Sequence, residues 1–170
     1  MGRGKRVKKT TSRVSEKALG EAYETAETIA LIAHSGQRRR GSGEPYISHP
    51  LRVAAGFEGI AKIAAILHDV VEDTPVTLAK LKAQGIPPQA IEIIDLLSRR
   101  QGEVYMRDFI ERIATAPGEA GSIARAVKLA DIADNLRGVE LLPPEEQGIT
   151  KRYKRARSRL LAAQSTQDRA

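Results

Sequence analysis

A short run of the chain concentrates side chains that bind metals and transfer protons. Residues 65–74 read AILHDVVEDT and hold His68, Asp69, Glu72 and Asp73 among aliphatic residues. Charge at this density in an apolar stretch is costly unless the groups bind something. On a helix the four side chains span an arc of about 140°. Because imidazole and carboxylate ligands without thiolates suit Mn, Fe or Zn, we predict a divalent metal at His68 and Asp69. Glu72 and Asp73 follow one turn on, where carboxylates can handle protons.

A second imidazole is predicted to reach the same centre. His49 lies nine residues before Glu58, and His68 lies ten residues after it. If the chain reverses at Glu58 and Gly59 as a helical hairpin, each side rises by about 13–15 Å at about 1.5 Å per residue. The two imidazoles then lie side by side. His49 is therefore expected to be a further metal ligand.

The remaining ligand is expected from residues 127–136, VKLADIADNL. Lys128, Asp131 and Asn135 have the spacing i, i+3 and i+7, which places them on one helix face. Small residues flank Asp131, as though something approaches the backbone there. Asp131 is therefore our candidate for the fourth ligand of the metal.

Helices are expected to position all of these groups. Helical spacing recurs through the chain and strand-like alternation is nearly absent. The pattern predicts one all-α domain of about eight helices. The expected helices cover residues 15–34, a short segment opening at 49–50 with Pro50 in the first position, 60–73, a segment from Thr74 and Pro75 to Gly85, 88–99, 103–115, 119–137 and 145–164.

Composition limits the classes of protein that fit. The 170 residues suit one domain, and 41% apolar residues with few aromatics predict a core of Ala, Leu, Ile and Val. With no cysteine, disulfides and thiolate metal sites are excluded, which favours the cytoplasm. Glu58 and Lys62 interrupt the best apolar run, so no membrane span is predicted.

The net charge of +7 is concentrated towards the chain ends. Residues 1–13 hold Lys and Arg without any acid, and residues 151–159 read KRYKRARSR. We interpret these runs as a solvated leader and a solvated helix face, with weak contact to RNA as the alternative. We predict a basic leader at 1–13, a domain at 14–165 and a tail at 166–170. The sequence indicates no oligomeric state.

Three stretches together resemble one family. AHSGQRRRGSGEPYISHPL at 33–51, LHDVVEDT at 67–74 and VKLADIADNL at 127–136 are similar to motifs of the HD phosphohydrolase superfamily. More narrowly, they resemble the hydrolase domain of Rel/SpoT-type alarmone enzymes and the stand-alone small alarmone hydrolases. The resemblance implies an HD-type helical domain. It also implies a metal, usually manganese, held by His49, His68, Asp69 and Asp131.

The resemblance also implies roles for further residues. Glu72 and Asp73 match the pair that assists the attack of water, as in hydrolase-competent members. The basic residue that contacts the nucleotide is Arg39 or Arg40. The other residues expected to bind substrate are Tyr46, which stacks on a base or packs the loop, Lys128 and Asn135. His34 is not expected to be a ligand and is expected either to be structural or to support a metal ligand. Tyr105 and Arg107 are weaker candidates for the far wall of the pocket. We expect the residues that recognise the base to lie between 98 and 125.

The function that follows is a manganese-dependent guanosine-3′,5′-bis(diphosphate) 3′-pyrophosphohydrolase, which degrades (p)ppGpp by attack of metal-activated water. With no synthetase-type segment after the third motif, we expect the chain to degrade the alarmone and not to make it. One alternative is a metal phosphohydrolase acting on a nucleotide monophosphate or the 2′-phosphate of NADPH. Another is a non-catalytic module that binds a nucleotide or RNA, and a purely structural helical domain ranks last.

Overall fold

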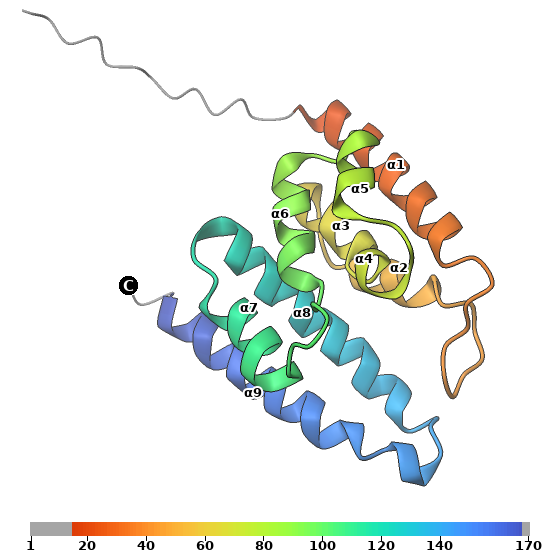
Figure 1. Ribbon diagram of the computed structural model, residues 1–170, viewed down its shortest axis with the longest axis vertical. Coiled ribbons are helices and arrows are strands. Elements are labelled where there is room, and N and C mark those ends of the chain that lie inside the picture. The colour runs from red at the N-terminus through yellow and green to blue at the C-terminus, as the bar shows by residue number, and fades with distance from the viewer. Residues whose placement is uncertain (1–14, 168–170) are drawn as a thin grey trace, which may run out of the picture.

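In the computed structural model, residues 15–167 of the protein are described, and among them the fold is entirely helical (Figure 1). The predicted leader at 1–13 and the last three residues of the predicted tail lie outside the described residues. The described part holds nine α-helices, one π-helical segment and one 3-10 turn, and it contains no strand beyond an isolated bridge between Arg38 and Pro45. The all-α prediction is confirmed.

The elements follow one another with short connections. They are α1 (Glu16–Ala33), α2 (Ser48–Ala54), α3 (Gly59–Leu67), α4 (Val70–Asp73), α5 (Leu78–Ala83), α6 (Pro88–Leu97), the π-helical η1 (Tyr105–Ile110), α7 (Glu111–Thr115), α8 (Gly118–Val139), the 3-10 turn η2 (Pro144–Glu146) and α9 (Ile149–Gln167). Among the described helices, none is long and apolar enough to cross a membrane.

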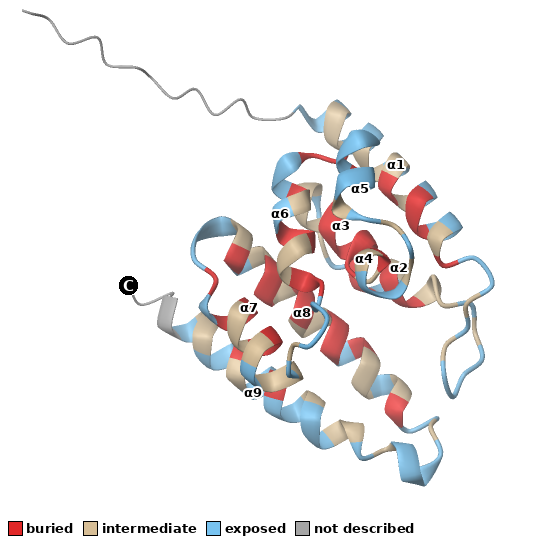
Figure 2. Cartoon of the chain, viewed as in Figure 1, coloured by how far each residue is buried: buried red, intermediate tan, exposed pale blue. Residues whose placement is uncertain are grey.

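Helix α3 lies at the centre of the molecule, with α1, α2, α6 and α8 packed around it. The side chains from Ile63 to Leu67 are all fully buried, which requires neighbours on every side of the helix. Figure 2 shows buried residues along α3 and on the inner side of α8. As the composition predicts, the core is mainly Ala, Ile, Leu and Val, with Phe109 as its buried aromatic ring.

The predicted helix at 60–73 is wrong, because the chain breaks at His68 and Asp69 into α3 and α4. The carbonyl of Ala65, which the N–H of Asp69 would use in a continuous helix, lies 2.7 Å from Nδ1 of His68. The side chain therefore competes with the backbone ladder at this point. The break changes the directions of the four polar side chains, so the 140° arc of a single helix does not apply.

Several predicted helix starts and continuations also differ from the structure. The helix expected from Thr74 begins at Leu78, where Thr77 caps it by accepting from the N–H of Lys80 at 3.2 Å. The hydroxyl of Thr74 instead donates to the carbonyl of Val70 at 2.6 Å. Pro50 is the third residue of α2 and not the first. The expected helices at 103–115 and 145–164 each divide in two, at η1 and α7 and at η2 and α9.

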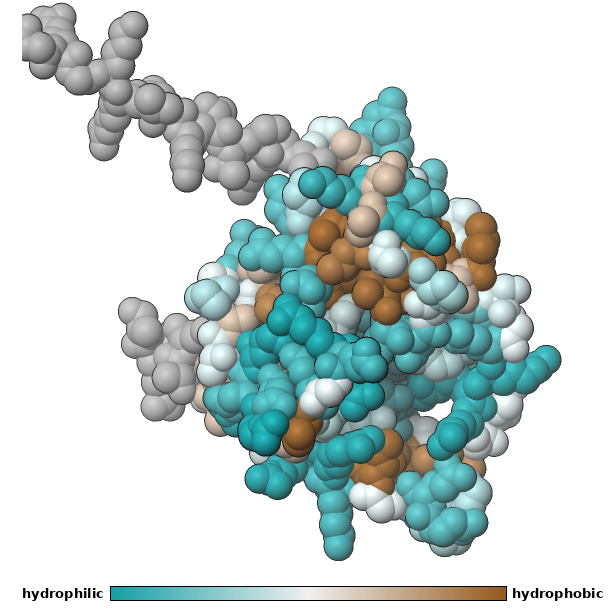
Figure 3. Space-filling view, in the orientation of Figure 1, coloured by the Kyte–Doolittle hydropathy of each residue, from teal (hydrophilic) through white to brown (hydrophobic). Residues whose placement is uncertain are grey.

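The outer surface carries an apolar groove of about 820 Å³ between α1 and α5. Ile29 and Ile32 of α1 line one side, and Val76 contributes from the segment before α5. Figure 3 shows apolar side chains gathered in this part of the surface, beside α1 and below α5, within a largely hydrophilic face.

Candidate metal centre and adjoining pocket

Four side chains from three separate segments converge on one buried point. Nε2 of His49 on α2 lies 3.1 Å from Oδ1 of Asp131 on α8 and 3.5 Å from Oδ2 of Asp69. Nε2 of His68 lies 3.1 Å from the same oxygen of Asp69 and 3.7 Å from that of Asp131. The two imidazole rings are 5.2 Å apart between centroids, as the hairpin at Glu58 predicts. These are the four residues that the sequence nominates as metal ligands.

The orientation of both imidazoles suits a cation. Nδ1 of His68 is held by the carbonyl of Ala65, and Nδ1 of His49 is held by Asp134 at 2.7 Å. Both Nε2 atoms therefore face the shared centre. Nε2 of His68 is buried and has no hydrogen-bond partner among the described residues. A buried nitrogen in that state is available to bind a cation, and His₂Asp₂ is a donor set that a divalent cation accepts.

The pKa values of the four side chains show that opposite charges are paired at the centre. Burial by itself lowers the pKa of His49 and of His68, but the surrounding carboxylates outweigh it and hold both pKa values above the ordinary range. Burial by itself raises the pKa of Asp69 and of Asp131. The charges and hydrogen bonds of the two imidazoles, and of Lys128 beside Asp131, outweigh burial and hold both pKa values well below the ordinary range. The centre therefore holds paired positive and negative charges without a metal, and a divalent cation can replace the imidazole protons.

Tyr46 connects this centre to Asp73. Its phenol oxygen lies 2.7 Å from Oδ2 of Asp69 and 3.1 Å from Oδ2 of Asp73. Burial, followed by the charge of Asp69, raises the pKa of the Asp73 carboxyl. The ring of Tyr46 also packs at 4.8 Å from the ring of His34, which is buried and hydrogen-bonded to Gln37. In this structure Tyr46 packs the loop and orients two carboxylates.

Glu72 lies at the rim of the centre in a bidentate arrangement with Arg99. Its Oε2 accepts from the backbone N–H of Arg99 at 3.1 Å, and its Oε1 lies 3.2 Å from the Nε of that residue. This pairing joins α4 to the end of α6, and it places a guanidinium beside the centre. The sequence does not indicate it, because Arg99 lies 27 positions further along the chain.

A cavity of about 190 Å³ opens directly onto the cluster. Asp69, Glu72, Asp73 and Asp131 face it as acids, and three cations, Arg99, Lys128 and Arg152, also line it. The ammonium of Lys128 lies 2.8 Å from Oδ2 of Asp131 and over the ring of Phe109. Burial alone would lower the pKa of Lys128, but Asp131 raises it overall, so the ammonium stays charged. Cations beside a metal centre suit a phosphorylated ligand.

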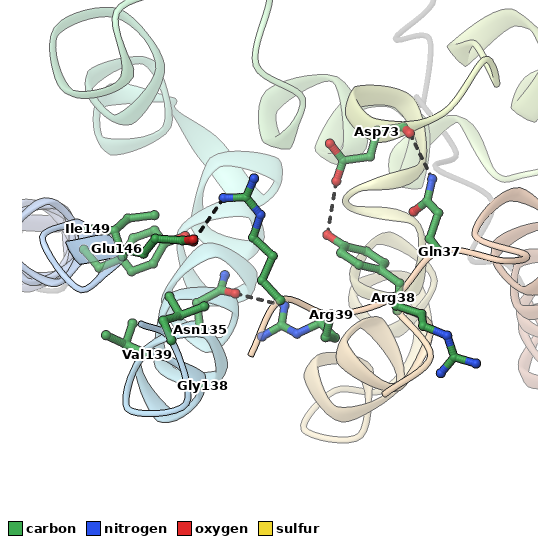
Figure 4. A pocket seen from close by; sticks show the side chains of 13 residues that line it. Gln37, Arg38, Arg39, Asp73, Asn135, Gly138, Val139, Glu146 and Ile149 are labelled. Carbon is green, nitrogen blue, oxygen red and sulfur yellow. Dashed lines mark hydrogen bonds and ion pairs between the residues drawn. The ribbon is translucent and has the colours of Figure 1, made fainter. Parts of the chain in front are cut away.

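A larger cavity of about 790 Å³ adjoins the first, and the two share Tyr46, Asp73, Asn135 and Tyr153 as lining residues. Figure 4 shows the larger cavity between the loop that carries Arg38 and Arg39 and the end of α8. Its other wall is apolar and consists of Val139, Leu142 and Ile149. This wall comes from α8, α9 and their connection, whereas Arg99, Tyr105 and Phe109 from the range 98–125 line the smaller cavity. The expectation that residues 98–125 recognise the base stays a prediction.

The two candidate arginines of the loop differ in their surroundings, although both line the larger cavity. Arg39 is 13% exposed, and its Nη1 donates to Oδ1 of Asn135 at 3.0 Å. Arg40 is 85% exposed and pairs with Glu146 at 3.3 Å. Arg39 is therefore held in place by α8, whereas Arg40 extends from the loop towards η2.

Of the two residues expected at the far wall of the pocket, Tyr105 lines a cavity and Arg107 does not. Tyr105 lines the smaller cavity, with Arg152 of α9 over its ring at 4.9 Å. Arg107 is exposed and pairs with the neighbouring Asp108, so it lines neither cavity. Tyr153, Arg152 and Asp134 were not predicted as site residues. The signal for Asp134 was its spacing of three residues from Asp131, which places both acids near one face of α8.

The sequence is similar to parts of known proteins. No family model matches the chain. It is 36% identical over 131 residues to the guanosine-3′,5′-bis(diphosphate) 3′-pyrophosphohydrolase of Haemophilus influenzae, which is 70% of this chain and 19% of that protein. It is 34% identical over 145 residues to the bifunctional (p)ppGpp synthase/hydrolase SpoT of Escherichia coli K12, which is 77% of this chain and 19% of that protein. The chain thus spans about a fifth of the length of these relatives.

A solved structure supports the fold. It is that of a metazoan ortholog of SpoT that hydrolyzes ppGpp, and it aligns with a TM-score of 0.69 over 82% of this chain and 85% of its own, at 22% identity. At that identity the likeness concerns the fold. The sequence relatives and the shared all-α architecture together confirm that the chain resembles the Rel/SpoT-type hydrolase domain of the HD superfamily.

Proposed function

We propose that the chain is a manganese-dependent (p)ppGpp 3′-pyrophosphohydrolase. The observation that carries the proposal is the convergence of two imidazoles and two carboxylates on one buried point beside a cavity lined with cations. The named activity of the curated relatives supports the choice of substrate. The lack of cysteine and the composition favour a cytoplasmic location, which stays a prediction.

His49, His68, Asp69 and Asp131 would hold the metal. A divalent cation bound there supplies Lewis-acid activation of water and of a phosphate oxygen. Mn²⁺ accepts this mixed nitrogen and oxygen donor set, as do Fe²⁺ and Zn²⁺, so manganese itself rests on the family resemblance.

The protein side chains would divide the remaining work. Lys128, Arg99 and Arg152 would bind the phosphate oxygens of the 3′-diphosphate in the smaller cavity. Asp73 has a raised pKa and lies beside the centre, which suits a group that takes a proton from the attacking water. Glu72 would assist by holding Arg99 against the phosphate.

The larger cavity would receive the nucleoside and its 5′-phosphates. The wall formed by Val139, Leu142 and Ile149 offers apolar surface to a base, while Arg39 and Arg40 lie opposite and can neutralise phosphate charge. The shared residues Tyr46 and Asn135 would contact the substrate where the two cavities join. A ligand with a phosphate group at one end and a nucleoside at the other fits this succession of cavities.

A panel of nucleotides tests the proposal. The purified chain would be incubated with ppGpp, pppGpp, GMP, AMP and NADPH in the presence of Mn²⁺, and again with EDTA. We expect pyrophosphate release from the alarmones, abolished by EDTA. Release of phosphate from NADPH or a monophosphate with no action on ppGpp would instead select the alternative phosphohydrolase.

The alternative of a non-catalytic module has one specific weakness. Glu72 and Asp73 line the cavity that would receive the anion, and carboxylates oppose anion binding unless they serve the reaction. Salt-dependent RNA binding with no hydrolysis of any nucleotide in the panel would favour that alternative. The candidate RNA surface is the exposed side of α9, which carries Lys151, Lys154 and Arg155.

A further inference from the structure

Asp134 of α8 is a buried carboxylate that lies outside the four predicted metal ligands and contacts one of them, His49. It is 3% exposed, and both of its oxygens are fully engaged. Oδ1 accepts from Nε of Arg52 at 2.8 Å and from Nη2 of Arg137 at 2.9 Å. Oδ2 lies 2.7 Å from Nδ1 of His49 and 3.2 Å from Nη2 of Arg52. A guanidinium of Arg39 stands 3.7 Å away.

This arrangement assigns the proton between Asp134 and His49. Three guanidinium groups surround the carboxylate, so it is ionised and can only accept hydrogen bonds. Nδ1 of His49 must therefore carry the proton. When the ring is neutral, its lone pair is then on Nε2, which faces Asp131 and Asp69.

His68 also carries its proton on Nδ1, but a different kind of partner holds it there. Nδ1 of His68 donates to a backbone carbonyl three residues earlier, in its own helical turn. His49 is near the start of α2 and takes its partner from a residue 85 positions later in the chain. The tautomer of His49 thus depends on one side chain, and it is open to a test by substitution.

We propose that Asp134 is the positioning residue of the metal centre: it fixes the ring orientation of His49 and keeps the proton on Nδ1, so that Nε2 is available to the cation. This inference rests on the proposed metal centre. A carboxylate that accepts from the distal nitrogen of a metal-binding imidazole typically raises metal affinity by about 10- to 100-fold.

The substitution Asp134→Asn isolates the effect. An asparagine has one oxygen, and with that oxygen kept at the Oδ1 position, where Nε of Arg52 and Nη2 of Arg137 donate, the amide NH₂ takes the Oδ2 position. The amide NH₂ then faces Nδ1 of His49 and favours the tautomer with the proton on Nε2, which directs a hydrogen at the metal position. We expect Mn²⁺ affinity, measured by calorimetry on EDTA-stripped protein, to fall by about 10- to 100-fold.

A matched control removes a partner of the same carboxylate without touching His49. Arg137→Gln deletes one donor to Oδ1, and the Arg137 side chain is 71% exposed. This variant should bind Mn²⁺ with wild-type affinity. An effect of equal size in both variants would indicate a purely structural role for Asp134 and would overturn the proposal.

A spectroscopic measurement needs no variant. In the diamagnetic Zn²⁺-loaded wild-type protein, the Nδ1 proton of His49 should resonate downfield, because it is hydrogen-bonded to a carboxylate. It should retain that shift in Arg137→Gln and move upfield in Asp134→Asn. A wild-type spectrum without a hydrogen-bonded Nδ1 proton at His49 would overturn the inference, even if the Asp134 variant fails to fold.

The outcomes separate the inference from the proposed function. If the wild-type chain binds neither Mn²⁺ nor Zn²⁺, the metal centre is wrong and the inference falls with it. If the wild type binds Mn²⁺ and Asp134→Asn binds it equally well, only the role of Asp134 is wrong.

Discussion

Nη1 of Arg39 donates a hydrogen bond of 3.0 Å to Oδ1 of Asn135, which lies 96 positions later in the chain. The amide of Asn135 in turn donates to Oδ1 of Asp131 at 2.5 Å. An arginine of the 34–47 loop is thus one side chain away from a predicted metal ligand. This connection places the arginine, which lines the larger cavity, against Asn135, which lines both cavities.

Arg39→Gln should weaken nucleotide binding. The change removes a positive charge from the larger cavity, and a hydrogen bond to a charged group contributes about 1.5–3 kcal/mol. We expect KM for ppGpp to rise by about 10-fold or more, with a smaller change in kcat, in steady-state assays. Arg100→Gln is the control, because Arg100 is exposed and pairs with Asp95 away from both cavities. Equal KM values in the two variants would remove Arg39 from substrate binding.

Asp69→Ala should abolish metal binding and turnover together. Its Oδ2 is within 3.5 Å of both imidazole Nε2 atoms, and an alanine offers no donor atom there. Loss of a residue that only hydrogen-bonds to a ligand typically reduces metal affinity by about 10- to 100-fold, and loss of a ligand itself should reduce it further. Metal content by mass spectrometry and ppGpp hydrolysis measure the two effects, with Asp95→Ala as a surface control. Full metal loading with retained activity would refute the assignment.

Glu72→Gln should retain the metal and lose most of the rate. Glu72 contacts Arg99 and none of the four predicted ligands, so the cation would stay bound. The neutral amide holds the guanidinium less firmly, and removal of a proton-handling or orienting group costs about 10²–10⁴-fold in rate. If Arg99→Gln reproduces the loss, the pair acts as a unit. Unchanged kcat in Glu72→Gln would exclude Glu72 from the mechanism.

Metal removal should lower the stability of the fold. The centre joins α2, α8 and the break between α3 and α4, so a cation that binds only the folded chain stabilises it. At a free metal concentration of 100 times Kd, the expected gain is about 2.7 kcal/mol. Thermal unfolding with and without EDTA measures it. A melting temperature that is indifferent to EDTA and to added Mn²⁺ would argue against a metal in this cluster.

Gly121→Ala should destabilise the domain, because α8 approaches the end of α7 at this point. A Cβ on Gly121 would clash with the carbonyl oxygen of Ala116, so the backbone must shift. We expect a loss of about 1–3 kcal/mol in urea unfolding. Gly20→Ala is the matched control, since nothing lies within 4 Å of its Cβ and it should stabilise α1 by about 0.5–1 kcal/mol. The same effect in both variants would contradict the close approach.

The sequence by itself was enough to nominate the metal centre, and the reason is local. His68 and Asp69 are adjacent, and the spacing of Lys128, Asp131 and Asn135 places them on one face of whatever helix they occupy. The hairpin at Glu58 needed only helix rise to bring His49 towards His68. Residue types and short-range periodicity therefore determine the helical class and nominate the ligands.

Tertiary packing determined the break between α3 and α4, the long-range side-chain pairs of the site and the apolar wall of the larger cavity, none of which the sequence patterns indicate. The break at His68 arises from a competition between a side chain and the helix ladder, which periodicity does not register. The pairs Glu72–Arg99 and His49–Asp134 join residues 27 and 85 positions apart. The apolar wall of the larger cavity comes from α8 and α9 because those helices pack against each other. Such contacts depend on how whole helices cross, since their free energy comes from burying surfaces shared by segments that are distant in the chain.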